Sequence, residues 1–168
     1  MKQIFAILFI FIVFMPTQAQ NFKLFDRYTI TSDSLYSKYS ELTSFEDYSL
    51  YAKGYIGQFQ NQKYGMTILF NETSYLLFME SLHEDQFKII DILKVNREDN
   101  CYLQNMMCFL DEEIDCEIVA LARIQKQEFQ TEEFFVNIIN SWRLNIKKKR
   151  IEIIDASNIK CYNEGYGV

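Results

Sequence analysis

Hydrophobic and polar positions alternate along the middle of the chain. In residues 64–70 (YGMTILF) every second side chain is large and apolar, and residues 75–80 (YLLFME) start another apolar run after the turn-forming segment 71–74. Residues 54–59 and 87–95 flank these runs with similar patterns. A period of two between turn residues is typical of β-strands. Residues 54–95 are therefore predicted to form an antiparallel meander.

Two other segments have apolar residues every three or four positions, which is the helical period. In residues 131–146 these positions are Phe134, Phe135, Ile138, Ile139, Trp142 and Ile146. Thr131 can cap the start, and Lys147 to Arg150 place positive charge at the end, as the helix dipole prefers. This predicts a long helix that buries Trp142 against a sheet. A second, N-terminal helix is predicted over residues 33–46, from Leu35, Tyr39, Leu42 and Phe45.

The alternating pattern returns in the last third of the chain. Residues 116–124 (CEIVALARI) predict a strand, and residues 150–155 and 158–162 predict two short closing strands, whereas residues 96–115 are polar and read as an irregular loop. Strands and helices in this order indicate a single α+β domain. We expect an antiparallel sheet of five to seven strands with the 131–146 helix packed on one face.

The first residues have the layout of a secretory signal peptide. Lys2 precedes an unbroken apolar run from Ile4 to Met15, Pro16 ends that run, and small residues lead up to Ala19. A spanning helix needs about 20 apolar residues, so this run is too short, and no later stretch is longer. The sequence predicts a cleaved signal peptide over residues 1–19, a mature domain over residues 20–168, no membrane span, and a periplasmic or secreted location.

Charge narrows the choice of partner. The formal net charge is −6, and cleavage that removes Lys2 takes it to −7. Nucleic acids and anionic lipid surfaces repel such a protein, so neither is expected as a partner. Eleven tyrosines offer side chains that suit contact with proteins or glycans. A cationic protein or a glycan is the expected kind of partner.

Four cysteines follow the predicted signal peptide: Cys101, Cys108, Cys116 and Cys161. An even number in an oxidising compartment favours disulfides, and no C-x-x-C pair indicates a metal site. The favoured pairing is Cys116–Cys161 with Cys101–Cys108, because Cys116 and Cys161 share the apolar sides of their strands. The pairing Cys108–Cys161 is the alternative.

Carboxylates gather in the segment DEEIDCE, at Asp111, Glu112, Glu113, Asp115 and Glu117. Calcium prefers such oxygen ligands, but the segment lacks the regular spacing of a calcium loop. A solvated acidic loop entering a strand explains the cluster equally well. No metal and no cofactor is expected.

The sole histidine, His83, lies in a predicted turn between charged residues. It could act as a general base oriented by a carboxylate, although a solvated turn residue is the simpler interpretation. No Gly-x-Ser-x-Gly elbow, His-Glu-x-x-His pair or Gly-rich phosphate loop is present in the sequence. No catalytic residue is assigned.

Residues 116–168 carry a Trp142-Arg143 pair, Cys161 and the ending Asn-Glu-Gly-Tyr-Gly. In these sequence features the segment resembles the C-terminal part of short exported bacterial proteins of unknown function. The resemblance implies an exported protein and carries over no catalytic residue.

Three functions follow from these observations. The first is an exported, non-catalytic binding protein or an inhibitory, immunity-type protein. The second is a small secreted, glycan-directed hydrolase that uses carboxylates, with its site drawn from Glu80, His83, Glu84 and the 111–117 cluster. The third is a structural subunit of the envelope. A flat aromatic patch rimmed with acid would favour the first function, and a deep pocket with two convergent carboxylates would favour the second.

Overall fold

The computed structural model describes residues 21–25, 28–31, 35–36, 45, 47–84 and 86–167. Strands dominate this part of the chain, and its one α-helix, α1 (Glu128–Thr131), has four residues. All strand pairs are antiparallel. The predicted signal peptide, residues 1–19, lies outside the described residues. Among the described helices, none has the length and apolar character needed to cross a membrane.

In the part of the chain that the structure describes, the strands form three larger sheets and one hairpin. The hairpin pairs β1 (Asn21–Phe25) with β2 (Tyr28–Thr31). Sheet I has the order β3 (Leu35–Tyr36), β7 (Gln86–Asn96), β6 (Ser74–His83), β5 (Gln62–Phe70), β4 (Ser49–Phe59). Sheet II has the order β14 (Arg150–Ile154), β13 (Ile138–Asn145), β11 (Ile118–Arg123), β8 (Cys101–Asn105). Sheet III has the order β10 (Glu113–Ile114), β9 (Cys108–Leu110), β15 (Ile159–Tyr162), β12 (Phe134–Phe135).

Sheet I confirms the predicted meander. Strands β4 to β7 follow one another and pair in sequence order, with connections at the predicted turn residues. Tyr64, Met66 and Ile68 of β5 face the main core, while Leu69 and the β6 residue Phe78 face a smaller cluster that includes Phe45. Both faces are thus apolar, which explains why β6 is buried along most of its length.

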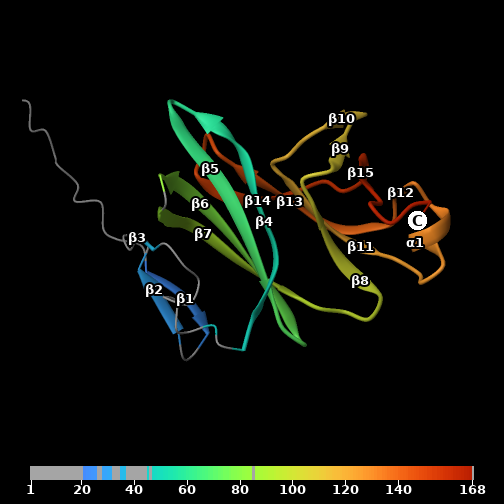
Figure 1. The fold of residues 1–168 in the computed structure, drawn as a ribbon, viewed down its shortest axis with the longest axis horizontal. Helices are drawn as coiled ribbons and strands as arrows, with labels where there is room; N and C mark the ends of the chain where they lie inside the picture. Colours follow the sequence, from blue (N-terminus) through green and yellow to red (C-terminus); the bar gives the residue numbers. More distant parts are fainter. Residues whose placement is uncertain are drawn as a thin grey trace, which may run out of the picture.

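Sheet II is the middle layer of the molecule (Figure 1). On one side, Val119 and Leu121 of β11 join the main core with sheet I. On the other side, Ile118 and Ala120 pack with Cys108 and Cys161 of sheet III. A strand covered on both faces reads as a continuous apolar run, and this is why β11 has the sequence IVALA.

Sheets I and II approach each other at two seams. At one seam the Tyr51 hydroxyl of β4 donates to the Leu103 carbonyl of β8, at 2.8 Å. At the other, the Ile151 amide of β14 donates to the Asp91 carboxylate of β7, at 2.7 Å. Strand β4 comes so close to the β8–β9 turn that a Cβ on Gly54 would lie 2.1 Å from the Met106 sulfur. A larger residue at this crossing would therefore displace the Met106 side chain.

The predicted fold class is wrong: the protein is a layered, mostly β structure, not an α+β domain with one sheet of five to seven strands and a long helix. Residues 131–146 contain the last residue of α1, the short strand β12 and all of β13. A bulge opposite Leu121 and Ala122 inserts Ile139 into β13. Ile139 and Trp142 both face the main core, so the bulge produces a three-residue spacing that imitates a helix.

Two further expectations need correction. Leu35 and Tyr36, inside the predicted 33–46 helix, form β3 and pair with β7; most of the remaining residues of that helix lie outside the described residues. The 96–115 segment, read as an irregular loop, contributes β8, β9 and β10. Trp142 is buried as predicted, with 7% of its surface exposed, but it is buried from a strand.

Candidate binding surfaces

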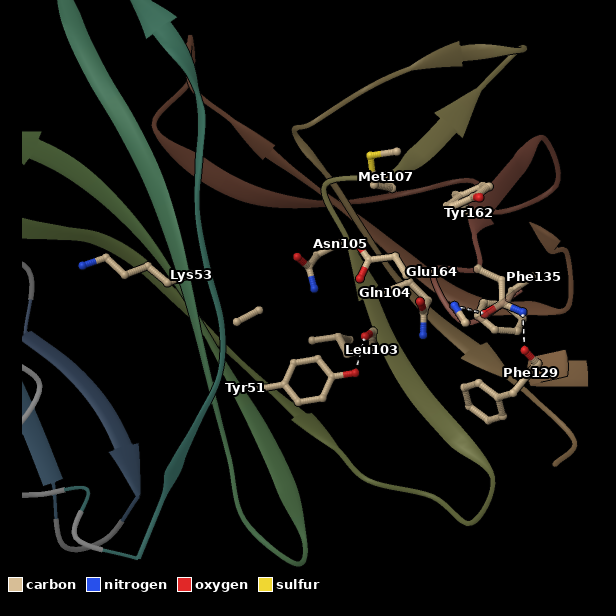
Figure 2. A pocket seen from close by; sticks show the side chains of 13 residues that line it. Tyr51, Lys53, Leu103, Gln104, Asn105, Met107, Phe129, Phe135, Tyr162 and Glu164 are labelled. Atoms are coloured by element: carbon tan, nitrogen blue, oxygen red, sulfur yellow. Dashed lines mark hydrogen bonds between the residues drawn. The ribbon is translucent and has the colours of Figure 1, made fainter. Parts of the chain in front are cut away.

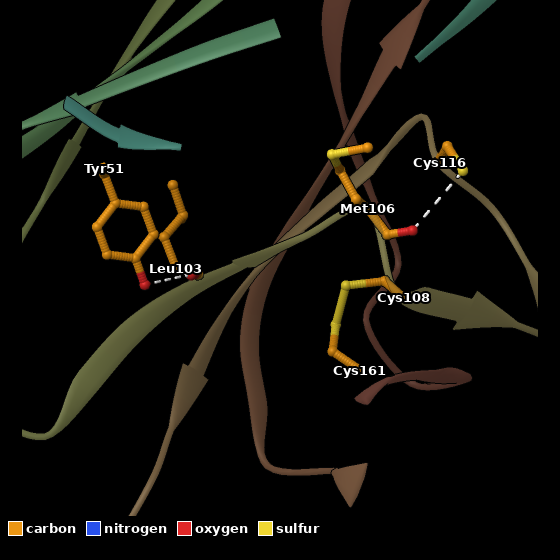
Figure 3. The surroundings of a disulfide bond; sticks show 6 residues. All are labelled: Tyr51, Leu103, Met106, Cys108, Cys116 and Cys161. Carbon is orange, nitrogen blue, oxygen red and sulfur yellow. Dashed lines mark hydrogen bonds between the residues drawn. A yellow bond between two sulfur atoms is a disulfide. The ribbon is translucent and has the colours of Figure 1, made fainter. Parts of the chain in front are cut away.

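The disulfide joins Cys108 of β9 to Cys161 of β15 (Figure 3). These two residues are register partners in sheet III. The alternative pairing is therefore confirmed and the favoured one, Cys116–Cys161 with Cys101–Cys108, is wrong. Cys101 is free and buried in the main core. Cys116 is also free; it precedes β11, where its sulfur lies 3.7 Å from the Met106 carbonyl oxygen.

Three aromatic side chains lie on the outer side of sheet III. Successive residues of a strand point to opposite faces of the sheet. In sheet III, Cys108, Phe135 and Cys161 are buried on the face that packs against sheet II. The residues next to them along each strand therefore point to the outer face. We call the outward set the aromatic face; it consists of Phe109, Ile114, Phe134, Lys160 and Tyr162. Ile114 is 54% exposed, and the rings of Phe109, Phe134 and Tyr162 are partly exposed.

Ring contacts make the aromatic face one continuous surface. Phe134 meets Phe109 and Tyr162 edge to face, with ring centroids 5.5 and 5.8 Å apart. The Lys160 ammonium lies 4.8 Å from the Phe134 centroid and also pairs with the Glu112 carboxylate. The only cation within the aromatic face is thus already neutralised by an acid on its rim.

The predicted acidic cluster spreads around this part of the molecule instead of converging. Asp111 accepts a hydrogen bond from Asn158, and Asp115 forms a 2.7 Å ion pair with Arg143. Burial, with help from Asp115, raises the pKa of the Glu117 carboxyl. Glu112 and Glu113 are exposed beside the aromatic face. Within the described residues no three His, Cys, Asp or Glu side chains form a group that could hold a metal ion.

The residues proposed for a hydrolase lie in two different places. Glu80 is fully buried in sheet I, where it accepts a hydrogen bond from Thr67 at 3.2 Å. His83 is exposed at the end of β6, with its Nε2 3.2 Å from the Ser81 hydroxyl oxygen. The 111–117 cluster borders sheet III, at the opposite side of the molecule from the β6–β7 turn (Figure 1). These groups do not form one site.

A groove of about 430 Å³ runs between β4 and the C-terminal segment (Figure 2). One wall is Tyr51 to Lys53 of β4, and the floor is Leu103 to Asn105 of β8. The opposite wall is formed by Met107, Phe129, Phe135 and the segment from Tyr162 to Gly165. Tyr162 therefore belongs to both the groove and the aromatic face.

Asn163 fixes the position of that opposite wall. Its side chain is buried, and its amide nitrogen lies 2.7–3.2 Å from the carbonyl oxygens of Glu128, Phe129 and Glu132 around α1. Its side-chain oxygen accepts the Gly165 amide at 3.0 Å. Sequence reasoning assigned no role to this residue. The sequence around Asn163 does not indicate which carbonyl groups, distant along the chain, its side chain contacts.

Comparison of the chain with protein-family models, with curated proteins and with solved structures finds no match. The class that the fold and surfaces define is a three-layer antiparallel β protein with an acid-rimmed aromatic face and an adjoining groove. Its function is inferred from those two surfaces.

Proposed function

We propose that the protein is an exported, non-catalytic binding protein, and that a cationic protein docks on its aromatic face. The observation that carries this proposal is the aromatic face itself. Aromatic side chains are enriched at the centres of protein interfaces, and charged side chains at the rim set the choice of partner.

The charges around the aromatic face support a basic partner. Glu112 and Glu113 are exposed at its β10 end, and the exposed pair Glu132 and Glu133 directly precedes β12. Lys160 is paired with Glu112. An acidic rim attracts a basic surface and repels acidic competitors.

Two observations support export without catalysis. The Cys108–Cys161 disulfide is compatible with an oxidising extracellular environment. A periplasmic or secreted location is the finer proposal, and it rests also on the predicted signal peptide. The separation of His83 and Glu80 from the acidic cluster argues against a carboxylate hydrolase.

Site-specific photo-crosslinking in the native host tests the proposal. A photoreactive phenylalanine analogue replaces Ile114, on the aromatic face, or Ile153 of β14, which is 83% exposed and serves as the matched control. We expect position 114 to yield a discrete adduct that mass spectrometry identifies as a basic protein. Position 153 should not yield that adduct.

A charge reversal sharpens the experiment. Glu113→Lys in the position-114 variant should reduce the yield of the adduct at least several-fold, whereas Glu72→Lys, in the exposed β5–β6 turn, should not. The proposal is overturned if position 114 gives no adduct, if both positions give the same one, or if the adduct is insensitive to Glu113→Lys.

A further inference from the structure

We propose that the groove between β4 and the C-terminal segment binds a neutral oligosaccharide. The inference is independent of the aromatic face, because the residues that carry it are Tyr51, Gln104, Asn105, Phe129 and Glu164. It assigns a ligand class to a second surface of the molecule.

The two walls carry aromatic rings held in fixed positions. The Tyr51 hydroxyl donates to the Leu103 carbonyl, and its ring meets Phe70 and Tyr75 edge to face at 5.8 and 5.2 Å. Burial, with a further contribution from Tyr75, raises the pKa of Tyr51 to about 12, so this hydroxyl stays a donor at physiological pH.

Phe129 is held in the same way on the opposite wall. Its ring packs edge to face against Tyr102 at 5.2 Å and against Phe135 at 5.4 Å. Rings that are fixed before binding lose little conformational entropy when a ligand stacks on them. Such walls suit the apolar C–H faces of pyranose rings, whose individual contacts are weak.

The space between the walls contains polar side chains that make no hydrogen bond within the described residues. Figure 2 shows the side chains of Gln104 and Glu164 between Tyr51 and Phe129, and that of Asn105 above Tyr51. No side-chain hydrogen bond joins any of these three residues to the part of the chain that the structure describes. Amides both donate and accept, and a carboxylate accepts. Sugar hydroxyls, which also donate and accept, complement this set.

Charge selects a neutral ligand over an anionic one. Lys53 lines the groove, but its ammonium lies 3.7 Å from the Phe87 ring centroid and points away from the groove (Figure 2). Glu164 supplies a negative charge that repels phosphates and uronic acids. A basic peptide would be attracted, but one carboxylate beside two neutral amides matches hydroxyl groups better than it matches several ammonium groups.

The volume sets the size of the ligand. Small-molecule sites commonly have volumes of about 300–1,000 Å³, and the groove has about 430 Å³. This accommodates about two or three sugar rings.

Titration calorimetry with neutral trisaccharides tests the inference: maltotriose, cellotriose, laminaritriose and tri-N-acetylchitotriose. We expect at least one to bind with a Kd below about 10 mM. The double variant Gln104→Ala/Glu164→Ala, which removes no hydrogen bond from the described structure, should weaken binding about tenfold. The matched double variant Gln58→Ala/Glu72→Ala changes the same residue types at exposed positions outside the groove and should bind normally.

Three results would overturn the inference: no trisaccharide binds at about 10 mM, the groove variant binds as well as the matched control, or trilysine binds in the groove while the sugars do not. The Glu113→Lys variant separates this inference from the proposed function. It should retain sugar binding even where partner crosslinking is lost.

Discussion

Asn163 connects the C-terminal segment to α1 through one buried side chain. Its amide meets three carbonyl oxygens, and its own oxygen accepts the Gly165 amide. Buried polar groups that lose their partners are costly. Substitution of Asn163 should therefore lower the free energy of unfolding more than substitution of either glycine that follows it.

We predict that Asn163→Ala lowers the free energy of unfolding by about 2–3 kcal/mol, because several carbonyls lose their donor at once. Urea denaturation followed by circular dichroism measures this loss. Asn158→Ala, which removes an exposed hydrogen bond to Asp111, is the matched control and should cost less than about 0.5 kcal/mol. Equal effects of the two substitutions would contradict the prediction.

Glu152 provides a test of pH dependence. Hydrogen bonds from Lys148, Arg150 and Asn145 lower the pKa of its carboxyl from 4.5 to about 2. The folded state therefore favours the ionised form, and the resulting stabilisation is fully present above pH 4.5 and is lost as the pH falls through about 2.

We predict that a carboxyl-detected NMR titration places the midpoint of Glu152 near pH 2. Glu152→Gln should flatten the dependence of stability on pH between 4.5 and 2, because the substituted side chain no longer titrates. A Glu152 midpoint near 4.5 would show that the hydrogen bonds do not form in solution.

Individual elements differ in how well the sequence predicts them. The β4–β7 strands have polar turn residues between alternating runs, and this signal is local. β13 lacks such a signal, because it packs on both faces and contains the extra residue Ile139. Its apolar side chains pack into two different cores, one on each face of the strand. Thr131, expected as a helix cap, is in fact the last residue of α1.

The candidate surfaces were less predictable than the elements. The aromatic face joins Phe109, Phe134 and Tyr162 from three strands that are distant in sequence. Their proximity depends on strand order, which the sequence pattern does not contain. The sequence predicts that Cys108 forms a disulfide but pairs it with Cys101, because the pattern of residues 96–115 does not indicate the strand β9.

The Cys108–Cys161 disulfide should contribute about 4 kcal/mol to stability, from the loss of chain entropy in the unfolded state over a separation of 53 residues. The variant Cys108→Ala/Cys161→Ala should show this loss in urea denaturation. Cys116→Ser, at a free and partly exposed cysteine, should change stability by less than about 0.5 kcal/mol. Rapid alkylation of Cys161 in the unreduced, folded protein would show that the bond is absent.

For the whole molecule, export makes a definite prediction about the N-terminus. Cleavage after Ala19 should leave Gln20 as the first residue of protein recovered from the native host, because small residues precede the cut and the apolar run ends at Pro16. N-terminal sequencing or intact mass measures this directly. Protein that retains residues 1–19 would contradict it.

The three sheets are distributed along the chain in different ways. Strands β4 to β7 of sheet I come from one continuous segment, residues 49–96. Sheets II and III are interleaved along the chain. Strand β8 of sheet II is followed by β9 and β10 of sheet III, then by β11 of sheet II and β12 of sheet III. The pair β13 and β14 of sheet II comes next, and β15 of sheet III is the last of these strands. No cut in the chain separates these two sheets.

This interleaving sets an order of folding. Local strand pairs form faster than pairs distant in sequence, so β5 and β6 should gain protected amides before β9 and β15. Pulsed hydrogen exchange during refolding measures that order, and simultaneous protection of β9 and β5 would contradict it. Sheet III cannot be completed until β15 is available to lie between β9 and β12. A chain that is synthesised or exported from its N-terminus therefore keeps sheet III incomplete until Tyr162 has emerged.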